Sequence, residues 1–386
     1  MTELRPPERN AKVLASDVRA IRSPGKRLGQ GGESYRVLVW LRLRRSASGL
    51  TGLILVSALL VMALFGDFFA PVDPKVSGVG FSPPAHISFT GRDGGFTLLP
   101  KVYPMVESNE LDPVTFQPLA GPDFDNPLDL GFFVRGYRYR LLGFIPGDIH
   151  FFGTRTGQPV HFLGTDKLGR DLLSRAIVGS RMSLMIALTV VAITTVVGTS
   201  VGIVSGYLGG AFDAWVQRFV DFVLAFPQLP LYLALTTLIP ITAPSKVFIA
   251  FVIAVLAALL WAQLSREVRG KTLALARIEY VRAAIAVGAG DGRIVFRHIL
   301  PNVLSHVIVA ITIQIPTVVL LESFLGFLGF AVKPPLISWG LMLQDTRAFS
   351  VIGSYPWILT PVIFVLITVF AFNALGDGLR DAVDPY

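Results

Sequence analysis

Long apolar runs separated by polar segments are the dominant pattern along this chain. A helix needs about 20 consecutive apolar residues to cross the hydrocarbon core of a bilayer. Six segments meet or approach that length, and several of them carry no charge. The pattern therefore predicts an all-α membrane protein with six transmembrane helices rather than a soluble protein with buried helices. The predicted spans cover residues 49–69, 183–208, 222–240, 247–264, 303–327 and 352–375.

Positive charges beside the spans predict the orientation of the chain, because cytoplasmic segments are enriched in Lys and Arg. The segment from Met1 to Arg45 holds eleven Lys and Arg against four acids, and the segment from Ser265 to Asn302 holds seven against three. Six spans place both segments and the C-terminus on the cytoplasmic side. We interpret residues 1–46 as a flexible cytoplasmic tail before a first transmembrane helix at 47–70. A cleaved signal peptide is disfavoured because that apolar run is too long for one.

The segment between the first two spans, residues 71–162, is rich in Pro and Gly and too polar to cross a bilayer. We interpret it as a large extracytoplasmic insertion with short strands and turns, including a strand pair in 131–144. A long surface loop is the alternative. Residues 163–181 then show an apolar face at helical spacing. They predict an interfacial amphipathic helix capped by Thr165 or Asp166, with a solvated helix packed on the insertion as the alternative. The remaining five spans form a core at 182–386.

Composition narrows the classes of function. Charged residues make up 16% of the chain, below the roughly 25% that is usual in soluble domains. Lys and Arg exceed acids by 34 to 26, but these charges flank apolar runs and so act as topology signals rather than as a nucleic-acid surface. The chain has no cysteine, and its five histidines lack metal-ligand spacing. We therefore predict no metal site, no catalytic residue and no nucleic-acid partner.

One polar stretch between the fourth and fifth spans, EYVRAAIAVGAGDGRIVFRHILP (residues 279–301), has the features of a docking element. Two adjacent alanines let its first half approach a partner closely. Two glycines permit a bend at low cost, an aspartate is placed to cap a second half, and a Leu-Pro pair ends the element. These residues are Ala283, Ala284, Gly288, Gly290, Asp291, Leu300 and Pro301. On these features alone, a docking element and an ordinary basic loop are equally supported.

Short motifs spread from Leu163 to Pro385 are weak signals singly and specific in combination. They are LGTD (163–166), GRD (169–171), SR (174–175), GSR (179–181), GY (206–207), GG (209–210), FLG (324–326), PP (334–335), SWG (338–340), ML (342–343), GDGLRD (376–381) and DP (384–385), with Asp213, Arg218, Asp221, Pro227 and Glu322. Together they resemble the membrane permease of ATP-binding-cassette (ABC) importers, in the dipeptide, oligopeptide and nickel group, and within it the C-type subunit.

This resemblance implies the type I ABC importer permease fold and makes residues 266–302 the cytoplasmic coupling loop, which partner ATPases move. Two positions depart from the broad coupling pattern. Arg282 stands where Glu is usual, so the ion pair of that Glu is not carried over, and His298 stands where Ile is usual, as in the peptide group. The residues that the resemblance assigns to ATPase coupling are Glu279, Arg282, Ala283, Ala284, Gly288, Gly290, Asp291, Leu300 and Pro301.

Polar residues inside the spans are treated as functional hypotheses. Glu322, near the outer end of the fifth span, matches a family position, and we expect a structural or gating role rather than substrate contact. Gln314 and Thr317 are candidates for lining the pathway, with packing between helices as the alternative. Asp221 and Arg218 are three residues apart on a helix, so we expect them to pair.

The mechanism that the resemblance implies is alternating access. Its partners are a homologous second permease subunit, two ABC ATPase subunits, a periplasmic substrate-binding protein and the lipid bilayer. This chain lacks the GxxxxGK[ST] pattern, so it is expected to bind no cofactor itself, with ATP and Mg²⁺ held by the ATPases.

We predict a multi-pass protein of the bacterial inner membrane that takes up di- and oligopeptides, with both termini cytoplasmic. Oligosaccharides, opines or metal complexes are the alternative substrates. An ion-coupled secondary transporter or membrane enzyme is disfavoured because the spans are nearly free of charge. The insertion is expected to contact the binding protein or the partner permease.

Overall fold

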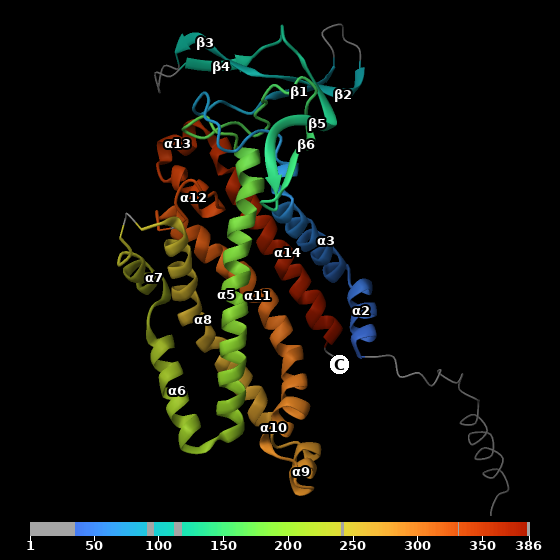
Figure 1. The fold of residues 1–386 in the computed structure, drawn as a ribbon, viewed down its shortest axis with the longest axis vertical. Coiled ribbons are helices and arrows are strands. Elements are labelled where there is room, and N and C mark those ends of the chain that lie inside the picture. The colour runs from blue at the N-terminus through green and yellow to red at the C-terminus, as the bar shows by residue number, and fades with distance from the viewer. Residues whose placement is uncertain (1–34, 91–95, 112–117, 241–242, 331, 384–386) are drawn as a thin grey trace, which may run out of the picture.

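The computed structural model describes residues 35–383 except 91–95, 112–117, 241–242 and 331, and these form a long helical bundle with β-sheets at one end (Figure 1). Within these residues, five helical stretches are long and apolar enough to cross a membrane, and a bent helix pair supplies up to one more. Their principal helices are α3 (Ala47–Leu64), α5 (Leu172–Leu208), α8 (Ser245–Leu275), α11 (Leu300–Phe327) and α14 (Thr360–Val383), and the bent pair is α6 (Gly210–Ala225) with α7 (Gln228–Thr236). The predicted helical membrane fold is thus confirmed.

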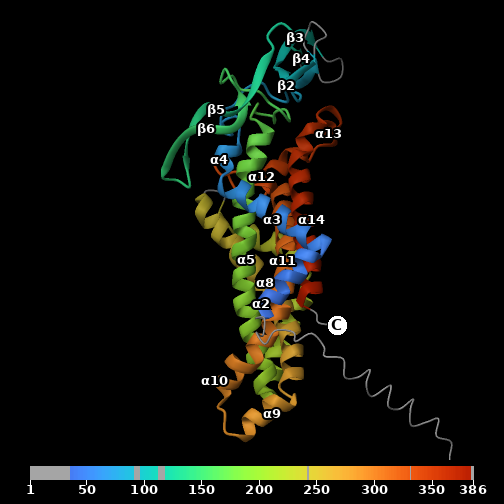
Figure 2. The ribbon, with the colours of Figure 1, turned by 90° about the vertical axis from the view of Figure 1, so that its right-hand side faces the viewer.

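Two ends of the bundle are distinguished by what they carry. The sheet end carries the β-strands, and the α9 end carries α9 (Glu279–Ala286) and α10 (Asp291–Ile294) (Figure 1). Helix α5 runs between the two ends; its 37 residues make a helix about 55 Å long at 1.5 Å per residue. The last turns of α14 lie toward the α9 end in both views, beside α2 (Tyr35–Arg45) (Figures 1 and 2).

Three glycines along α5 explain why α8 packs so closely against it. Gly198, Gly202 and Gly206 are spaced by four residues, so they share one helix face, which is turned toward α8. A Cβ atom on Gly202 would lie 2.6 Å from the carbonyl oxygen of Ser265, and one on Gly206 would lie 2.9 Å from that of Arg269. Small residues at this spacing let membrane helices pack backbone against backbone.

The first span packs against the last one in the same manner. A Cβ atom on Gly378 of α14 would lie 2.1 Å from the Cα of Gly49 on α3, and one on Gly52 would lie 2.2 Å from the Leu375 nitrogen. Helix α3 begins directly after Ser46, whose Oγ accepts a hydrogen bond from the Gly49 amide at 3.2 Å. The N- and C-terminal spans are therefore held side by side.

The insertion forms two antiparallel sheets. One has four strands in the order β1-β2-β5-β6, and the other pairs β3 with β4. The buried residues Val102, Leu128 and Val160 form a small apolar core at the larger sheet. The strands are β1 (His86–Thr90), β2 (Phe96–Tyr103), β3 (Met105–Leu111), β4 (Pro118–Pro122), β5 (Leu128–Leu141) and β6 (Ile145–Thr154). The strand pair predicted at 131–144 exists, but that tract supplies only β5 and the turn, because β6 begins at Ile145.

The interfacial helix predicted at residues 163–181 is wrong. The chain turns at Gly164 and Gly169, which have φ of +75° and +74°, conformations that favour glycine. Helix α5 begins only after Asp171, whose carboxylate accepts a hydrogen bond from the Ser174 amide at 2.7 Å. It then continues unbroken into the second span, so neither Thr165 nor Asp166 caps it. The periodic argument overlooked the turn-forming glycines within an apparently helical pattern.

Two other spans differ from their predicted form. The third, predicted at 222–240, is not one straight helix, because α6 and α7 are bent by 78° at a break before Gln228. Pro227 at this break lacks a backbone N–H and disfavours helical geometry in the residue before it. The sixth span begins at Thr360 as an α-helix, because α13 (Phe349–Ser354) ends before it and residues 356–359 form a 3₁₀ turn.

Part of the predicted flexible tail is ordered. Residues 35–45 form α2, which packs against α3 and α14. Residues 1–34, the rest of that prediction, lie outside the described residues. Helix α8 extends to Leu275, well beyond the predicted span end at residue 264. Its added turns are polar, which is why apolar run length did not detect them.

Candidate functional site

The polar stretch at residues 279–301, termed here the coupling segment, folds as two short helices joined by a tight turn. Helix α9 is followed by Gly288 at φ +86°, then by α10, a π-helical turn at 295–299 and α11. The predicted bend at Gly288 is therefore present, whereas Gly290 has φ −70° and needs no special conformation. Single π-helical turns within longer helices occur frequently at functional sites.

Buried apolar side chains fasten the coupling segment to the spans. Val281, Ile294 and Ile299 are almost completely buried and cluster with Ile203 of α5 and Val268 of α8. The side-chain amide of Asn302 donates a hydrogen bond at 3.2 Å to the Tyr280 hydroxyl, which adds a polar link between α9 and α11. Movement of the segment would therefore be transmitted to α5, α8 and α11.

The opposite face of the coupling segment is exposed and carries apolar and basic side chains. Val287 is 86% exposed, and Ile285 and Phe296 are also exposed large apolar residues. Glu279, Arg282, Ala283, Gly288 and Gly290 are exposed, Ala284 and Leu300 are half-buried, and the basic residues Arg293 and Arg297 add to the exposed face. Contiguous exposed apolar side chains with a polar rim are typical of a protein interaction site.

Two predicted details of this segment are wrong. Asp291 does not cap the second half, because the N-cap position is Gly290 and no side chain bonds there. The Asp291 carboxylate instead accepts a hydrogen bond at 2.7 Å from the Tyr207 hydroxyl on α5. Pro301 does not end the element. It lies in the first turn of α11, where its missing N–H costs little, and the chain stays helical through it.

Charged residues near the α9 end join α5, α6 and α8. Arg269 of α8 donates two hydrogen bonds, at 2.6 and 2.5 Å, to the Asp213 carboxylate on α6, and Ser205 of α5 donates another at 2.5 Å. The predicted pair of Asp221 with Arg218 is wrong. Asp221 pairs with Arg266 of α8, while the Arg218 guanidinium lies 5.7 Å from the Trp215 ring centroid.

A groove of about 160 Å³, with both apolar and polar lining residues, lies between α8 and α11. The candidate residues Gln314 and Thr317 both line it, together with Gln263 and Glu267 of α8. The carboxylate of Glu267 lies 3.3 Å from His306 of α11. Sequence reasoning missed Gln263 and Glu267, although two polar residues four apart in a largely apolar helix were the available signal.

Glu322 does not line this groove. It is buried near the sheet end of α11, and its carboxylate accepts a hydrogen bond from Ser183 Oγ at 3.0 Å. Ser183 in turn accepts a hydrogen bond at 3.1 Å from the Trp339 amide of α12 (Trp339–Leu343). Trp339 is itself buried and donates through its ring nitrogen to the Ala176 carbonyl at 2.8 Å. The acid is therefore part of a polar junction among α5, α11 and α12.

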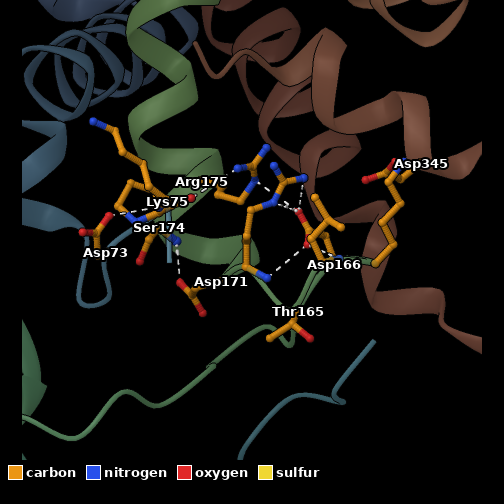
Figure 3. A network of polar contacts seen from close by, with 12 residues as sticks. Asp73, Lys75, Thr165, Asp166, Asp171, Ser174, Arg175 and Asp345 are labelled. Carbon is orange, nitrogen blue, oxygen red and sulfur yellow. Dashed lines mark hydrogen bonds and ion pairs between the residues drawn. The ribbon is translucent and has the colours of Figure 1, made fainter. Parts of the chain in front are cut away.

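The LGTD and GRD motifs build a second polar junction, at the sheet end (Figure 3). The Asp166 carboxylate accepts hydrogen bonds from the Leu168 and Arg170 amides at 2.9 and 3.0 Å and from the Arg170 guanidinium at 2.7 Å. Arg175 of α5 lies 3.4 Å from the same carboxylate, and both groups are nearly fully buried. Figure 3 shows Arg175 turned toward Asp166.

The same junction ties the start of the insertion to its end. Ser174 Oγ accepts from the Val72 amide at 3.1 Å, and Thr165 Oγ1 accepts from the Ser82 amide at 2.7 Å. Lys167 pairs with Asp345 at 2.8 Å, which brings in the segment after α12. The insertion therefore leaves and rejoins the bundle at one fastened point.

Family models match the two parts of the chain on either side of the insertion. The model for "Binding-protein-dependent transport system inner membrane component" matches residues 198–386. The model for "N-terminal TM domain of oligopeptide transport permease C" matches residues 34–84. The α9–α10 coupling segment and the groove both lie within the first of these ranges.

Individual relatives agree with these models. The chain is 41% identical to the oligopeptide transport system permease protein OppC of Haemophilus influenzae over 231 residues, which are 60% of this chain and 72% of the relative. It is 38% identical over 225 residues, 58% of this chain and 72% of the relative, to the glutathione transport system permease protein GsiD of Pectobacterium atrosepticum.

One solved structure is similar in part. An inward-facing MetNI methionine ABC transporter aligns with a TM-score of 0.43 and 19% identity, over 55% of this chain and 98% of that one. The identity and coverage of the permease relatives, with the apolar helices of the bundle, establish a multi-pass inner-membrane protein. The chain belongs to the family of binding-protein-dependent transport system inner membrane components, the permeases of ABC importers.

Proposed function

We propose that this chain is one of two permease subunits of an ATP-driven importer of peptides. The observation that carries the proposal is the coupling segment, whose exposed apolar and basic face is joined by buried residues to three long helices. The relatives named for oligopeptide, dipeptide and glutathione transport support peptides as the transported class.

In this proposal the α9 end is cytoplasmic, with the N- and C-termini on the same side. Two partner ATPases bind ATP and Mg²⁺ and press on the coupling segment, so this chain needs no cofactor or catalytic residue. Coupling requires that the two states differ in contacts at the segment and at the spans. The buried cluster around Val281 and Ile299 supplies the stiff connection between them.

The groove between α8 and α11 is proposed to form one wall of the transport pathway. Gln314 and Thr317 lie near the middle of α11, and Glu267 lies closer to the α9 end of α8. Ionisable and amide groups within membrane helices face other helices or water-filled cavities rather than lipid. A homologous second permease would complete the pathway, and its opening toward the α9 end corresponds to release into the cytoplasm. Glu322 lies outside the groove and is proposed to hold the junction among α5, α11 and α12 closed.

The insertion is proposed to face the periplasm and to contact the substrate-binding protein through the β1–β4 part of its sheets. Strands β2, β3 and β4 lie in the outermost part of the sheet end in both views (Figures 1 and 2). Their fastening at the junction around Asp166 would transmit a docking event directly to α5.

The coupling proposal is tested by placing a bulky charge on the exposed face of α9. Ala283→Arg is matched by Ala211→Arg, because Ala211 is also an exposed helical alanine near the α9 end, on α6. We expect Ala283→Arg to abolish peptide uptake and the stimulation of ATPase activity by the binding protein, in proteoliposomes that contain all subunits. Ala211→Arg is expected to retain both. If Ala283→Arg retained uptake and stimulation, the coupling assignment would be wrong.

A further inference from the structure

The β5–β6 hairpin extends beyond the four-stranded sheet and has no role in the function proposed above. It leaves the sheet and runs back toward the bundle, so that its turn reaches the level of α4 (Gly66–Phe69) in both views (Figures 1 and 2). An isolated two-stranded hairpin is at best marginally stable in water. The outer half of this hairpin therefore needs a surface to lie against.

The root of the hairpin is fastened to the end of the first span. His150 of β6 is fully buried, and its Nδ1 lies 3.1 Å from the carbonyl oxygen of Asp67, which comes three residues after α3 ends. The hydroxyl of Tyr137 on β5 donates to the same carbonyl at 3.4 Å. Burial and the nearby Asp67 raise the pKa of Tyr137, which keeps this hydroxyl protonated as a donor. The hairpin root is thus held beside the end of the first span.

Aromatic side chains gather at this level. The rings of Phe68 and Phe69 in α4 lie 6.0 and 5.5 Å from the ring of Phe151 on β6, and Phe133 of β5 lies 6.3 Å from Phe68. Aromatic residues are enriched at the membrane–water interface, where their rings lie at the level of the lipid headgroups. The cluster continues the interface of the first span onto the hairpin.

The free end of the hairpin combines apolar and basic groups. Phe144 in the turn is 70% exposed, and Leu142 and Ile145 beside it are also exposed large apolar residues. Arg138 and Arg140 lie between the root and the turn, and Arg135 lies at the level of the root, against one acid between residues 135 and 149, Asp148. All three arginines are exposed. An exposed apolar tip flanked by arginines complements a surface with apolar chains beneath phosphate groups.

We propose that the β5–β6 hairpin binds the phospholipid surface at the sheet end of the bundle. The turn residues Leu142, Phe144 and Ile145 insert at the level of the headgroups, and Arg138 and Arg140 bind phosphates of anionic lipids. Three observations agree on a lipid surface rather than a protein partner. They are the fixed height of the root at the end of a span, the aromatic cluster that continues the span interface, and the excess of positive charge.

Depth measurement on a single spin label tests the proposal, because the natural chain has no cysteine. Phe144→Cys and, as a control, Val106→Cys on the outer strand β3 are labelled with a nitroxide in the full chain, reconstituted in phosphatidylcholine vesicles with phosphatidylglycerol. Val106 is also exposed. We expect the label at position 144 to collide with oxygen several-fold more than with a water-soluble nickel chelate, relative to the label at 106.

Charge reversal then tests the lipid headgroups. Each basic residue near an anionic surface contributes about a fivefold factor in binding. The double variant Arg138→Glu with Arg140→Glu is expected to reduce the population of spin labels at 144 that is shielded from the nickel chelate by more than tenfold in the anionic vesicles. Arg155→Glu, at an exposed position beyond β6, is expected to leave this population unchanged.

Two results would overturn the proposal. In the first, the label at 144 is as accessible to the nickel chelate as the label at 106 in every vesicle. In the second, the label is protected only after the second permease subunit is added, regardless of lipid charge, which would assign the hairpin to that subunit.

Discussion

One ion pair at each end of the bundle shows how differently charged residues are held there. At the sheet end, Asp166 and Arg175 are 3% and 4% exposed and share a junction with backbone amides. Near the α9 end, Arg266 and Asp221 form an ion pair whose side chains are 52% and 65% exposed. Buried pairs cannot separate without leaving an uncompensated charge, whereas exposed pairs exchange with water at little cost. The difference indicates that the Asp166 junction is fixed, whereas the Asp221–Arg266 pair can rearrange.

A second contrast lies between the junction around Trp339 and the coupling segment. Trp339 and Glu322 at the sheet end are buried in one junction, while Val287 and Phe296 of the coupling segment remain exposed. Under the proposed coupling, the α9 end receives force from another protein and therefore needs an open face. An end that must keep helices in register needs satisfied polar contacts instead.

The largest expected effect comes from breaking the buried junction. Asp166→Ala leaves Arg170 and Arg175 without their carboxylate and removes the Oδ1 atom that accepts from two backbone amides. Removal of one partner from a buried ion pair costs about 3–5 kcal/mol. Asp221→Ala is the matched control at the exposed pair, with an expected cost of about 0–1 kcal/mol. Thermal unfolding of both variants in the same lipid nanodiscs measures the difference.

Equal destabilisation by Asp166→Ala and Asp221→Ala would remove the basis for the comparison. It would mean that the junction around Asp166 is hydrated in the membrane and that its ion pair exchanges with water. Burial of this junction would then not fix α5 to the insertion.

A smaller effect is expected from the glycine face that joins the two ends along α5. Gly202→Ala places a Cβ 2.6 Å from the Ser265 carbonyl oxygen, and we expect the forced separation of α5 and α8 to cost about 1–3 kcal/mol. Gly270→Ala on α8 is the matched control, because a Cβ there meets no atom within 4 Å. The control is expected to stabilise the helix by about 0.5–1 kcal/mol, since alanine replaces glycine inside a helix.

Opposite shifts of the unfolding temperature for the same substitution are therefore expected at these two positions. If Gly202→Ala were neutral or stabilising, α5 and α8 would have room to separate, and the backbone contact would not be what holds the long helices together.

Apolar run length identified the spans because hydrocarbon thickness sets their length, but it could not locate helix ends outside the bilayer. Helix α5 begins at Leu172 and α8 ends at Leu275, in polar surroundings where the apolar signal is absent. Family motifs located the coupling segment, and Gly288 takes the predicted bend. Family motifs could not identify the residue with which each polar side chain pairs.

Long-range polar pairs were beyond sequence reasoning for a physical reason. Asp213 and Arg269 are 56 positions apart, and they meet only because α6 folds back beside α5 and α8. The local rule of three to four residue spacing instead favoured Arg218 for Asp221, whereas α8 supplies Arg266. Tertiary packing decides such pairs, and periodicity within one helix carries no information about it.

The smallest expected change in stability, and the most specific in function, is at the link between α5 and the coupling segment. Tyr207→Phe removes only the hydroxyl that donates to Asp291 at 2.7 Å. Because this contact is exposed, its loss should cost no more than about 0.5–1.5 kcal/mol. The buried cluster around Ile294 still anchors the segment, so the variant should fold and assemble.

A polar link at the turn nevertheless fixes the angle between α10 and α5, so we expect binding-protein-stimulated ATPase activity to persist while peptide uptake per ATP falls several-fold. Tyr280→Phe, which removes the hydroxyl that accepts from Asn302, is the control for the polar link between α9 and α11, and it should leave that ratio closer to the original. An unchanged ratio of uptake to ATP hydrolysis in Tyr207→Phe would show that the apolar cluster alone transmits the movement, and the α9 end would then differ from the sheet end by exposure but not by its use of polar contacts.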